Sequence, residues 1–184
     1  MNSKTLFCFI IGIWCLTGPS RVSVRVGGRL TVRCVYDDGF QDYIKYWCKG
    51  ESSKYCDVQI KTEGSNEVPS GRLIIKDNPY SRSFTVTIKD VRYSDDDYYY
   101  CGIERNARDN MHMVTVDVLP GVCRKASPWT HMVDFPENFT EISVNSSVVV
   151  SCQQEYREKN ITLQCREEYR QFLLSPADGN TPCV

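Results

Sequence analysis

The sequence predicts an all-β protein whose first domain, residues 19–119, is a two-sheet sandwich, and three features support this. Residues 30–34 form a short alternating run that ends in Cys34, and Trp47 follows thirteen residues later. Asp, Asp, Tyr and Cys occupy alternate positions of residues 95–101, and alternate residues share one face of a strand. The order Cys34, Trp47, Cys101 is typical of two sheets joined by a disulfide beside a buried tryptophan.

Tyr99 makes this prediction more specific. It lies two residues before Cys101, as does the tyrosine corner of strand F in immunoglobulin domains. The sequence therefore predicts an immunoglobulin variable-type domain with a Cys34–Cys101 disulfide and with Trp47 in the core.

The strands of this domain follow from period-two alternation and turn residues. They are expected at residues 22–26, 30–36, 43–49, 73–75, 83–88 and 114–118, before the domain ends at Leu119-Pro120-Gly121. If Trp47 faces the core, Tyr46 and Cys48 point outward. The same parity turns Lys45 inward, with its stem along apolar surface and its ammonium at the end of the sheet.

Two further contacts are expected to brace the sandwich. Cys48 and Cys56 bracket a short hairpin, and their spacing favours a second disulfide over a zinc pair or two free thiols. Arg72 and Asp95 are expected to form a bidentate pair at the base of the sandwich, the alternative being an exposed pair of little worth.

Composition favours a secreted or extracellular binding protein. The chain has 184 residues, a net charge of −1, ten cysteines and only two histidines. The cysteine content indicates an oxidising compartment, and the charge gives no reason to expect nucleic acid as a partner. No nucleophile elbow, phosphate loop or histidine pair at metal spacing occurs, so a binding module is expected rather than an enzyme, with no cofactor and no metal.

The N-terminus, residues 1–18, is expected to be a secretory signal peptide. Residues 6–16 are an apolar run of eleven residues, followed by small and turn residues. The alternative is a buried N-terminal strand. Cleavage near Gly18 removes Cys8 and Cys15 and leaves eight cysteines. No later stretch has the apolar length of a membrane span, so the chain is expected to be secreted or to be an ectodomain cut before its anchor.

With these residues placed, the first domain resembles the polymeric immunoglobulin receptor and the CMRF-like leukocyte receptors. The resemblance covers about residues 19–119 and is carried by the Lys-Tyr-Trp-Cys-Lys motif at residues 45–49, by Cys56 and by residues 95–102. It implies an immune receptor at the plasma membrane that binds a protein or lipid ligand and signals or transports through a membrane anchor. Relative to that pattern, this chain is expected to lack the anchor and the cytoplasmic tail, and the sequence does not identify a signalling adaptor.

Variable domains bind through the loops at one end of the sandwich. Those loops are residues 37–42, between strands B and C, and residues 102–110, between strands F and G. The candidate ligand-binding residues are Asp37, Asp38, Phe40, Glu104, Arg105, Asn106 and Arg108. The expected ligand is a protein, with immunoglobulin as one candidate, or an anionic lipid on cell surfaces. A soluble decoy or carrier of the same ligand is the alternative function.

Residues 120–184 allow two interpretations. Residues 144–152 repeat the pattern of residues 26–34, and Cys165 follows Cys152 at nearly the Cys34–Cys48 interval. This favours an incomplete second immunoglobulin-like domain, although Gln164 stands in place of the core tryptophan. The alternative is a complement-control (sushi) module, whose four cysteines are bonded first to third and second to fourth. Four cysteines allow three connectivities, so sequence alone does not choose.

Three N-glycosylation sequons lie in this second segment and none lies in the first domain. They begin at Asn138, Asn145 and Asn160. If occupied, they would solvate the second segment and leave the first domain bare for contact.

Overall fold

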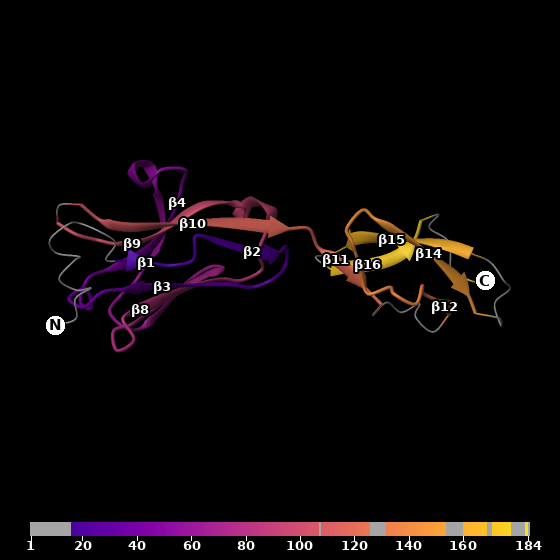
Figure 1. The fold of residues 1–184 in the computed structure, drawn as a ribbon, viewed down its shortest axis with the longest axis horizontal. Helices are drawn as coiled ribbons and strands as arrows, with labels where there is room; N and C mark the ends of the chain where they lie inside the picture. Colours follow the sequence, from indigo (N-terminus) through magenta and orange to yellow (C-terminus); the bar gives the residue numbers. More distant parts are fainter. Residues whose placement is uncertain are drawn as a thin grey trace. The chain divides into compact units, whose positions relative to one another are not determined.

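The computed structural model describes residues 16–106, 108–125, 132–153, 160–168, 171–177 and 183. The chain divides into two compact units, Met1–Leu119 and Pro120–Val184 (Figure 1). Each unit is a β structure with its own core. The all-β, variable-type class predicted from the sequence is confirmed.

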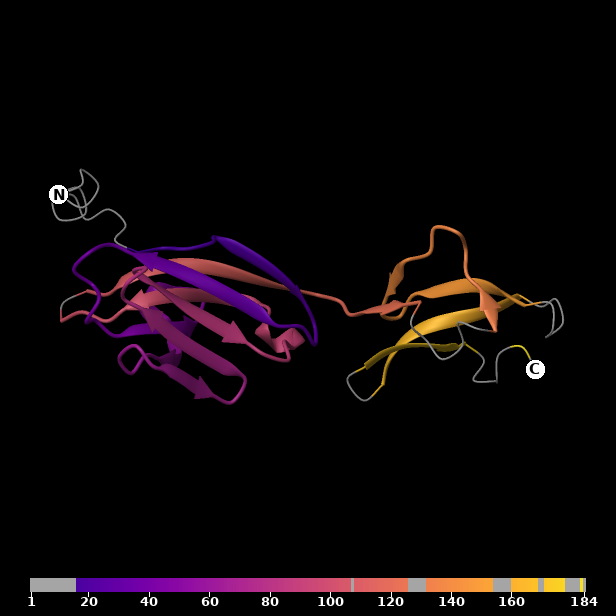
Figure 2. The same ribbon diagram turned by 90° about the horizontal axis from the view of Figure 1, so that it is seen from below.

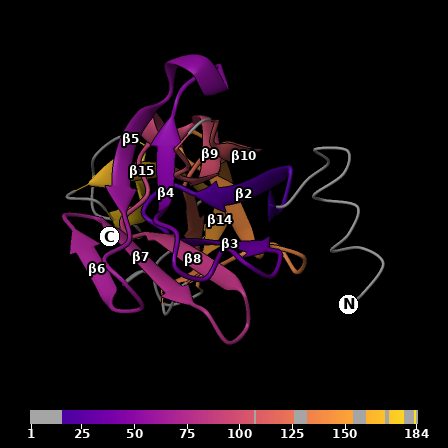
Figure 3. The ribbon, with the colours of Figure 1, turned by 90° about the vertical axis from the view of Figure 1, so that its left-hand side faces the viewer.

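The first unit consists of two five-stranded sheets packed face to face (Figures 2 and 3). The back sheet has the order β1 (Leu16–Thr17), β3 (Leu30–Tyr36), β8 (Ser83–Ile88), β7 (Leu73–Asn78) and β6 (Glu67–Ser70). The front sheet has the order β2 (Arg21–Arg25), β10 (Asn110–Leu119), β9 (Asp97–Ile103), β4 (Lys45–Lys49) and β5 (Asp57–Lys61). Strand β2 runs parallel to β10, whereas the other strand pairs are antiparallel.

The core lies between the sheets, as the alternation of the strands requires. Every second residue of β3 is buried and the residues between them are exposed. Trp47 is fully buried and stacks on Tyr99 with ring centroids 5.0 Å apart, beside the Cys34–Cys101 disulfide. The Tyr99 hydroxyl donates to the Asp95 carbonyl at 3.1 Å, which is the hydrogen bond of a tyrosine corner.

The last residues of the expected signal peptide are placed in the first unit. Leu16 and Thr17 pair with Tyr36 and Val35 of β3, and Leu16 is 1% exposed within the core. An apolar side chain at this edge fills space between the sheets. The extent of the signal peptide, residues 1–18, stays a prediction. Residues 1–15, with most of the predicted signal peptide, lie outside the described residues.

Lys45 points inward, and its ammonium is enclosed at the end of the sheet. Both it and Asp77 of the opposite sheet are almost inaccessible, and Nζ lies 2.8 Å from Asp77 Oδ2. The ammonium also donates to the carbonyls of Gln41 at 2.8 Å and Tyr43 at 2.6 Å. Three acceptors match its three N–H groups, which offsets the cost of removing the charge from water.

The expected pair at the base of the sandwich is bidentate. Arg72 donates from Nη1 to Asp95 Oδ2 at 2.7 Å and from Nη2 to Oδ1 at 2.9 Å. Asp95 also accepts from the Arg92 backbone N–H at 2.8 Å. Burial acts to raise the pKa of Asp95, but these donors outweigh it and hold that pKa below its usual value.

The second unit differs from the arrangement that an internal repeat predicts. A two-stranded sheet pairs β11 (Val122–Arg124) with β13 (Glu141–Ser143); a four-stranded sheet has the order β12 (Val133–Asp134), β14 (Ser147–Cys152), β15 (Asn160–Glu168) and β16 (Gln171–Pro176). Strands β14 and β15 are neighbours in one sheet, whereas their supposed counterparts β3 and β4 belong to opposite sheets.

The disulfides of this unit join Cys123 to Cys165 and Cys152 to Cys183. This first-to-third, second-to-fourth connectivity is the one expected of the complement-control alternative. A valine-rich strand ending in a cysteine is compatible with either fold, so the sequence pattern did not distinguish the two.

Candidate functional site

The predicted loops meet at one end of the front sheet. Phe40 of the B–C loop lies beneath the Arg105 guanidinium of the F–G loop, 5.8 Å from ring centroid to Cζ. The backbone N–H of Glu104 donates to the Ile44 carbonyl at 2.9 Å. The two loops therefore support each other, as expected for loops that form one surface.

Phe40 itself is not a surface residue. It is 7% exposed, belongs to the core cluster, and contacts the Tyr43 ring with centroids 5.4 Å apart. Transfer of an aromatic ring from water into the core is favourable, so the B–C loop places the Phe40 ring inside the domain. Phe40 as a direct ligand contact stays a prediction; in this structure its ring packs in the core and supports Arg105.

The other predicted residues occupy the rim of the loops. Asp37 is half-buried, and Asp38 accepts from Gln41 Nε2 at 2.6 Å. Because strand β9 continues to Ile103, the F–G loop is shorter than expected. Its exposed members include Glu104, which pairs with Lys61 at 2.6 Å, together with Asn106 and Arg108.

Asp109 anchors the F–G loop to the front sheet. Its Oδ1 accepts from the Arg105 backbone N–H at 2.8 Å, and its Oδ2 accepts from the Tyr46 hydroxyl at 2.8 Å. Burial, and then this hydrogen bond to a carboxylate, raise the pKa of Tyr46, so the phenol stays protonated and remains a donor. Arg108 has no hydrogen bond or ion pair to any residue that the structure describes, so its guanidinium remains available.

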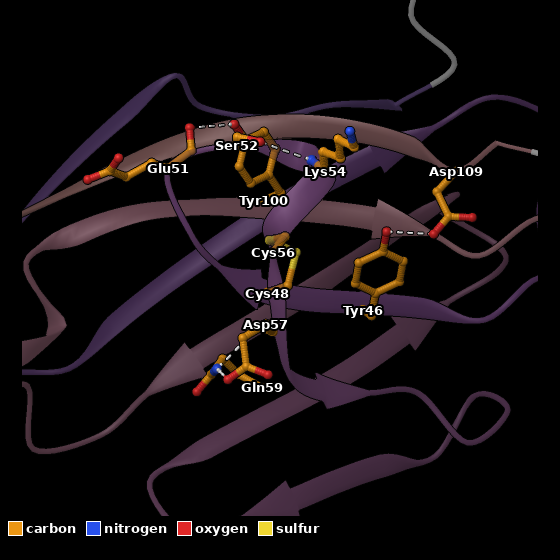
Figure 4. The surroundings of a disulfide bond; sticks show 10 residues. All are labelled: Tyr46, Cys48, Glu51, Ser52, Lys54, Cys56, Asp57, Gln59, Tyr100 and Asp109. Carbon is orange, nitrogen blue, oxygen red and sulfur yellow. Dashed lines mark hydrogen bonds between the residues drawn. A yellow bond between two sulfur atoms is a disulfide. The ribbon is translucent and has the colours of Figure 1, made fainter.

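The hairpin between β4 and β5 is fixed against the outer face of the front sheet (Figure 4). The Cys48–Cys56 disulfide closes it, and it contains the 3₁₀ turn η1 (Ser53–Tyr55). The Tyr100 hydroxyl donates to the Glu51 carbonyl at 3.4 Å. A side chain at Gly50 would come within 2.6 Å of the Tyr55 carbonyl, so this tight closure requires glycine.

A groove runs over the outer face between this hairpin and the F–G loop. Tyr46, Tyr100 and Met111 pack together in its lining. The charged lining residues are Lys54, Lys61, Arg105 and Arg108, together with Glu104 and Asp109. The Tyr46 ring lies directly over Gly102, where any Cβ would overlap it. The groove therefore combines aromatic side chains with more cations than carboxylates.

Sequence reasoning missed Lys54, Tyr100 and Met111 as parts of a site. Strand parity was the available signal for two of them. Tyr100 on β9 and Met111 on β10 face the same side of the sheet as Cys48 on β4, because they lie beside outward-facing residues of the neighbouring strands. What parity did not reveal is that the hairpin lies back over that face. Within the described ranges, no group of histidine, cysteine or acidic side chains is arranged to hold a metal ion. The same ranges contain no helix that meets the length and hydropathy of a membrane span.

Comparison with known proteins agrees with this architecture. The family model of the immunoglobulin V-set domain matches residues 17–119. CMRF35-like molecule 3 of Mus musculus is 43% identical over 108 residues, which are 58% of this chain and 44% of that protein. CMRF35-like molecule 5 of Homo sapiens is 40% identical over 116 residues, which are 62% of this chain and 60% of that protein. The chain thus spans only part of the length of these relatives.

A solved structure extends the likeness in fold. The ectodomain of the teleost fish polymeric Ig receptor superposes with a TM-score of 0.53 and 22% identity, covering 87% of this chain and 72% of that one. At this identity the likeness concerns the fold alone. The V-set match covers more than half of the chain, and the chain therefore belongs to the immunoglobulin V-set domain family, with CMRF35-like molecules among its relatives.

Proposed function

We propose that this chain is the ectodomain of an immune-type cell-surface receptor, and that its first unit binds a protein ligand at the F–G loop and the adjoining groove. The observation that carries the proposal is Arg108. It is exposed, lines the same groove as these aromatic side chains and has no partner among the described residues. Arginine and tyrosine are enriched among the residues that dominate binding energy at protein interfaces.

The chemistry of the groove favours a protein carrying an acidic group. Arg108 and Lys54 offer charge to a carboxylate, while the rings of Tyr46 and Tyr100 offer rigid apolar contact at small cost in side-chain entropy. The disulfide-closed hairpin and the Tyr46–Asp109 hydrogen bond hold the groove in shape before binding, which lowers the cost of association. Immunoglobulin is one candidate ligand of this kind.

The experiment is a binding assay with the full chain. The labelled protein is applied to leukocytes before and after protease treatment of the cells, to purified immunoglobulin, and to phosphatidylserine vesicles. We expect protease-sensitive binding that Arg108→Glu lowers at least tenfold. Arg33→Glu is the matched control, because Arg33 is exposed on the back sheet. Arg105 is a poorer choice than Arg108, since it packs on Phe40.

Two results would contradict the proposal. Equal binding by Arg108→Glu and by the unaltered chain would place the site elsewhere. Binding to vesicles together with indifference to protease would identify an anionic lipid as the ligand. A soluble decoy or carrier would bind through the same surface, so detection of this chain in the culture medium or at the plasma membrane distinguishes the two roles.

We infer further that the second unit is a disulfide-rich spacer of the complement-control type that carries glycans. Asn138, Asn145 and Asn160 are all exposed, so each is accessible for modification. Treatment of the secreted chain with peptide N-glycosidase should lower its mass, and Asn→Gln replacements should assign each site. An unchanged mass would show that the sequons are unused.

A further inference from the structure

A second hollow, separate from the groove, lies at the loop end of the first unit. It has a volume of about 270 Å³ and opens between the B–C loop, the β5–β6 loop and the β7–β8 turn. Its lining includes Tyr43, Ile44, Thr62, Ser65, Asp77 and Pro79. We propose that this hollow is a pocket that receives one uncharged apolar side chain of the protein ligand. This proposal rests on the proposed function, because the pocket adjoins the same loops.

Asp77, which contributes to the lining of the pocket, has its charge matched by a buried partner. Asp77 accepts from the Tyr36 hydroxyl at 2.9 Å and pairs with the Lys45 ammonium at 2.8 Å. The ammonium lies 4.5 Å from the Tyr36 ring centroid, and its other donors bind the carbonyls of Gln41 and Tyr43. An occupant therefore meets a charge pair whose groups are already matched, and gains nothing by bringing a charge of its own.

The same pair shapes the walls. By holding the Gln41 and Tyr43 carbonyls inward, Lys45 fixes the B–C loop, in which Tyr43 and Ile44 remain 43% and 44% exposed. Thr62 closes the other side, where its backbone N–H donates to the Lys45 carbonyl at 2.8 Å and its hydroxyl accepts from the Lys45 N–H at 3.0 Å. Two exposed apolar side chains are thus held rigidly beside a hollow of side-chain size.

Charge and size select the occupant. Asp42 is exposed at the rim and repels an acidic group, which separates this pocket from the cationic groove. The apolar surfaces of Tyr43, Ile44 and Pro79 favour a leucine or an aromatic ring. On one ligand, the pocket would bind an apolar residue and Arg108 would bind an acidic residue.

The test uses side-chain mimics and needs no knowledge of the ligand. N-acetyl-leucine amide and N-acetyl-phenylalanine amide are titrated into the full chain while backbone amide chemical shifts are recorded. We expect saturable shifts confined to the segments that line the pocket, residues 41–44, 62–65 and 77–80, with a dissociation constant on the order of millimolar. Ser65→Trp, which fills the pocket, and Ile44→Asp, which charges its wall, should each weaken these shifts at least tenfold.

Ser65→Trp should also lower binding to cells at least tenfold. Ser70→Trp is the matched control, since Ser70 is exposed at the far end of β6. Arg108→Glu should leave the amide titration unchanged, so a failure of the pocket and a failure of the groove can be told apart. The proposal is overturned if no saturable shift occurs, if Ser65→Trp changes neither the shifts nor cell binding, or if N-acetyl-arginine amide gives the stronger saturable response.

Discussion

The two units of this chain hold themselves together in different ways. The core of the first unit is built from aromatic and aliphatic side chains of two five-stranded sheets, with one disulfide, Cys34–Cys101, inside it. In the second unit, four of the nine buried core residues that the structure describes are cysteines.

The difference reflects the area that each unit can bury. A small unit buries a smaller fraction of its surface on folding, so it depends more on covalent links. The second unit comprises only Pro120–Val184, whereas the first comprises Met1–Leu119. We therefore expect that removing disulfides destabilises the second unit more than the first. Truncating a core side chain should destabilise the first unit more than the second.

The largest effect is expected from removing the Cys152–Cys183 disulfide. Cys152→Ser with Cys183→Ser frees a loop of sequence separation 31, which costs about 4 kcal/mol on the chain-entropy model and exceeds what so small a core can spare. Hydrogen exchange should then show loss of protection throughout β14, β15 and β16, with β3 and β9 unchanged. Retained protection in β15 would show that the second core is sufficient without this link.

Trp47→Ala should be the largest single-residue effect on the first unit. The side chain is fully buried and stacked on Tyr99, so its removal leaves a cavity and costs about 3–5 kcal/mol. The melting transition of the first unit should fall while hydrogen exchange in β15 stays unchanged. An unaltered melting temperature would mean that the sandwich repacks around the missing ring.

The sequence predicts the first unit well because its signals are local and periodic. Alternation placed β3 and β8 at their observed bounds, and the spacing of Cys34, Trp47 and Cys101 identified the fold. The inward turn of Lys45 also followed from parity. Its partner Asp77 did not, because that contact joins strands of opposite sheets and no periodicity within one strand reports on it.

The candidate site was predicted less well for the same kind of reason. Loop position suggested Arg108 and Phe40 alike, but only the packed structure shows that one is exposed and the other is buried. The hairpin that lies over Tyr100 and the connectivity of the second unit depend on contacts between distant segments. Short sequence patterns at Cys152 and Cys34 resemble each other without implying the same neighbours.

The Arg72–Asp95 pair tests whether electrostatics contribute to the first unit beyond its core. Asp95→Asn removes a charge that accepts from Arg72 and Arg92, with an expected cost of about 1–3 kcal/mol. Because the folded pKa of Asp95 is lowered, its stabilisation is full above the unfolded value of about 3.9 and is lost as the pH falls through the folded value. The melting temperatures of the two proteins, measured from pH 6 to pH 2, should converge below about pH 4. A difference in melting temperature that stays constant with pH would mean that the charge of the Asp95 carboxylate is not the source of the stabilisation.

The smallest effect is expected from Tyr46→Phe, which asks whether the outer face of the first unit matters for stability or for binding. The substitution removes only the hydroxyl that donates to Asp109 at 2.8 Å and leaves the ring over Gly102. Hydrogen bonds to charged groups contribute about 1.5–3 kcal/mol, but the half-buried Asp109 carboxylate can bind water instead, so the expected cost is about 1 kcal/mol and the melting temperature should change little. Asp109 would lose its link to the sheet while keeping the Arg105 backbone N–H, and the F–G loop beside Arg108 should become more mobile. We therefore expect weaker binding to cells with nearly unchanged stability. A fall in stability without any loss of binding would instead show that the Tyr46 hydroxyl stabilises the sandwich. It would also show that binding at the groove does not depend on a fixed F–G loop.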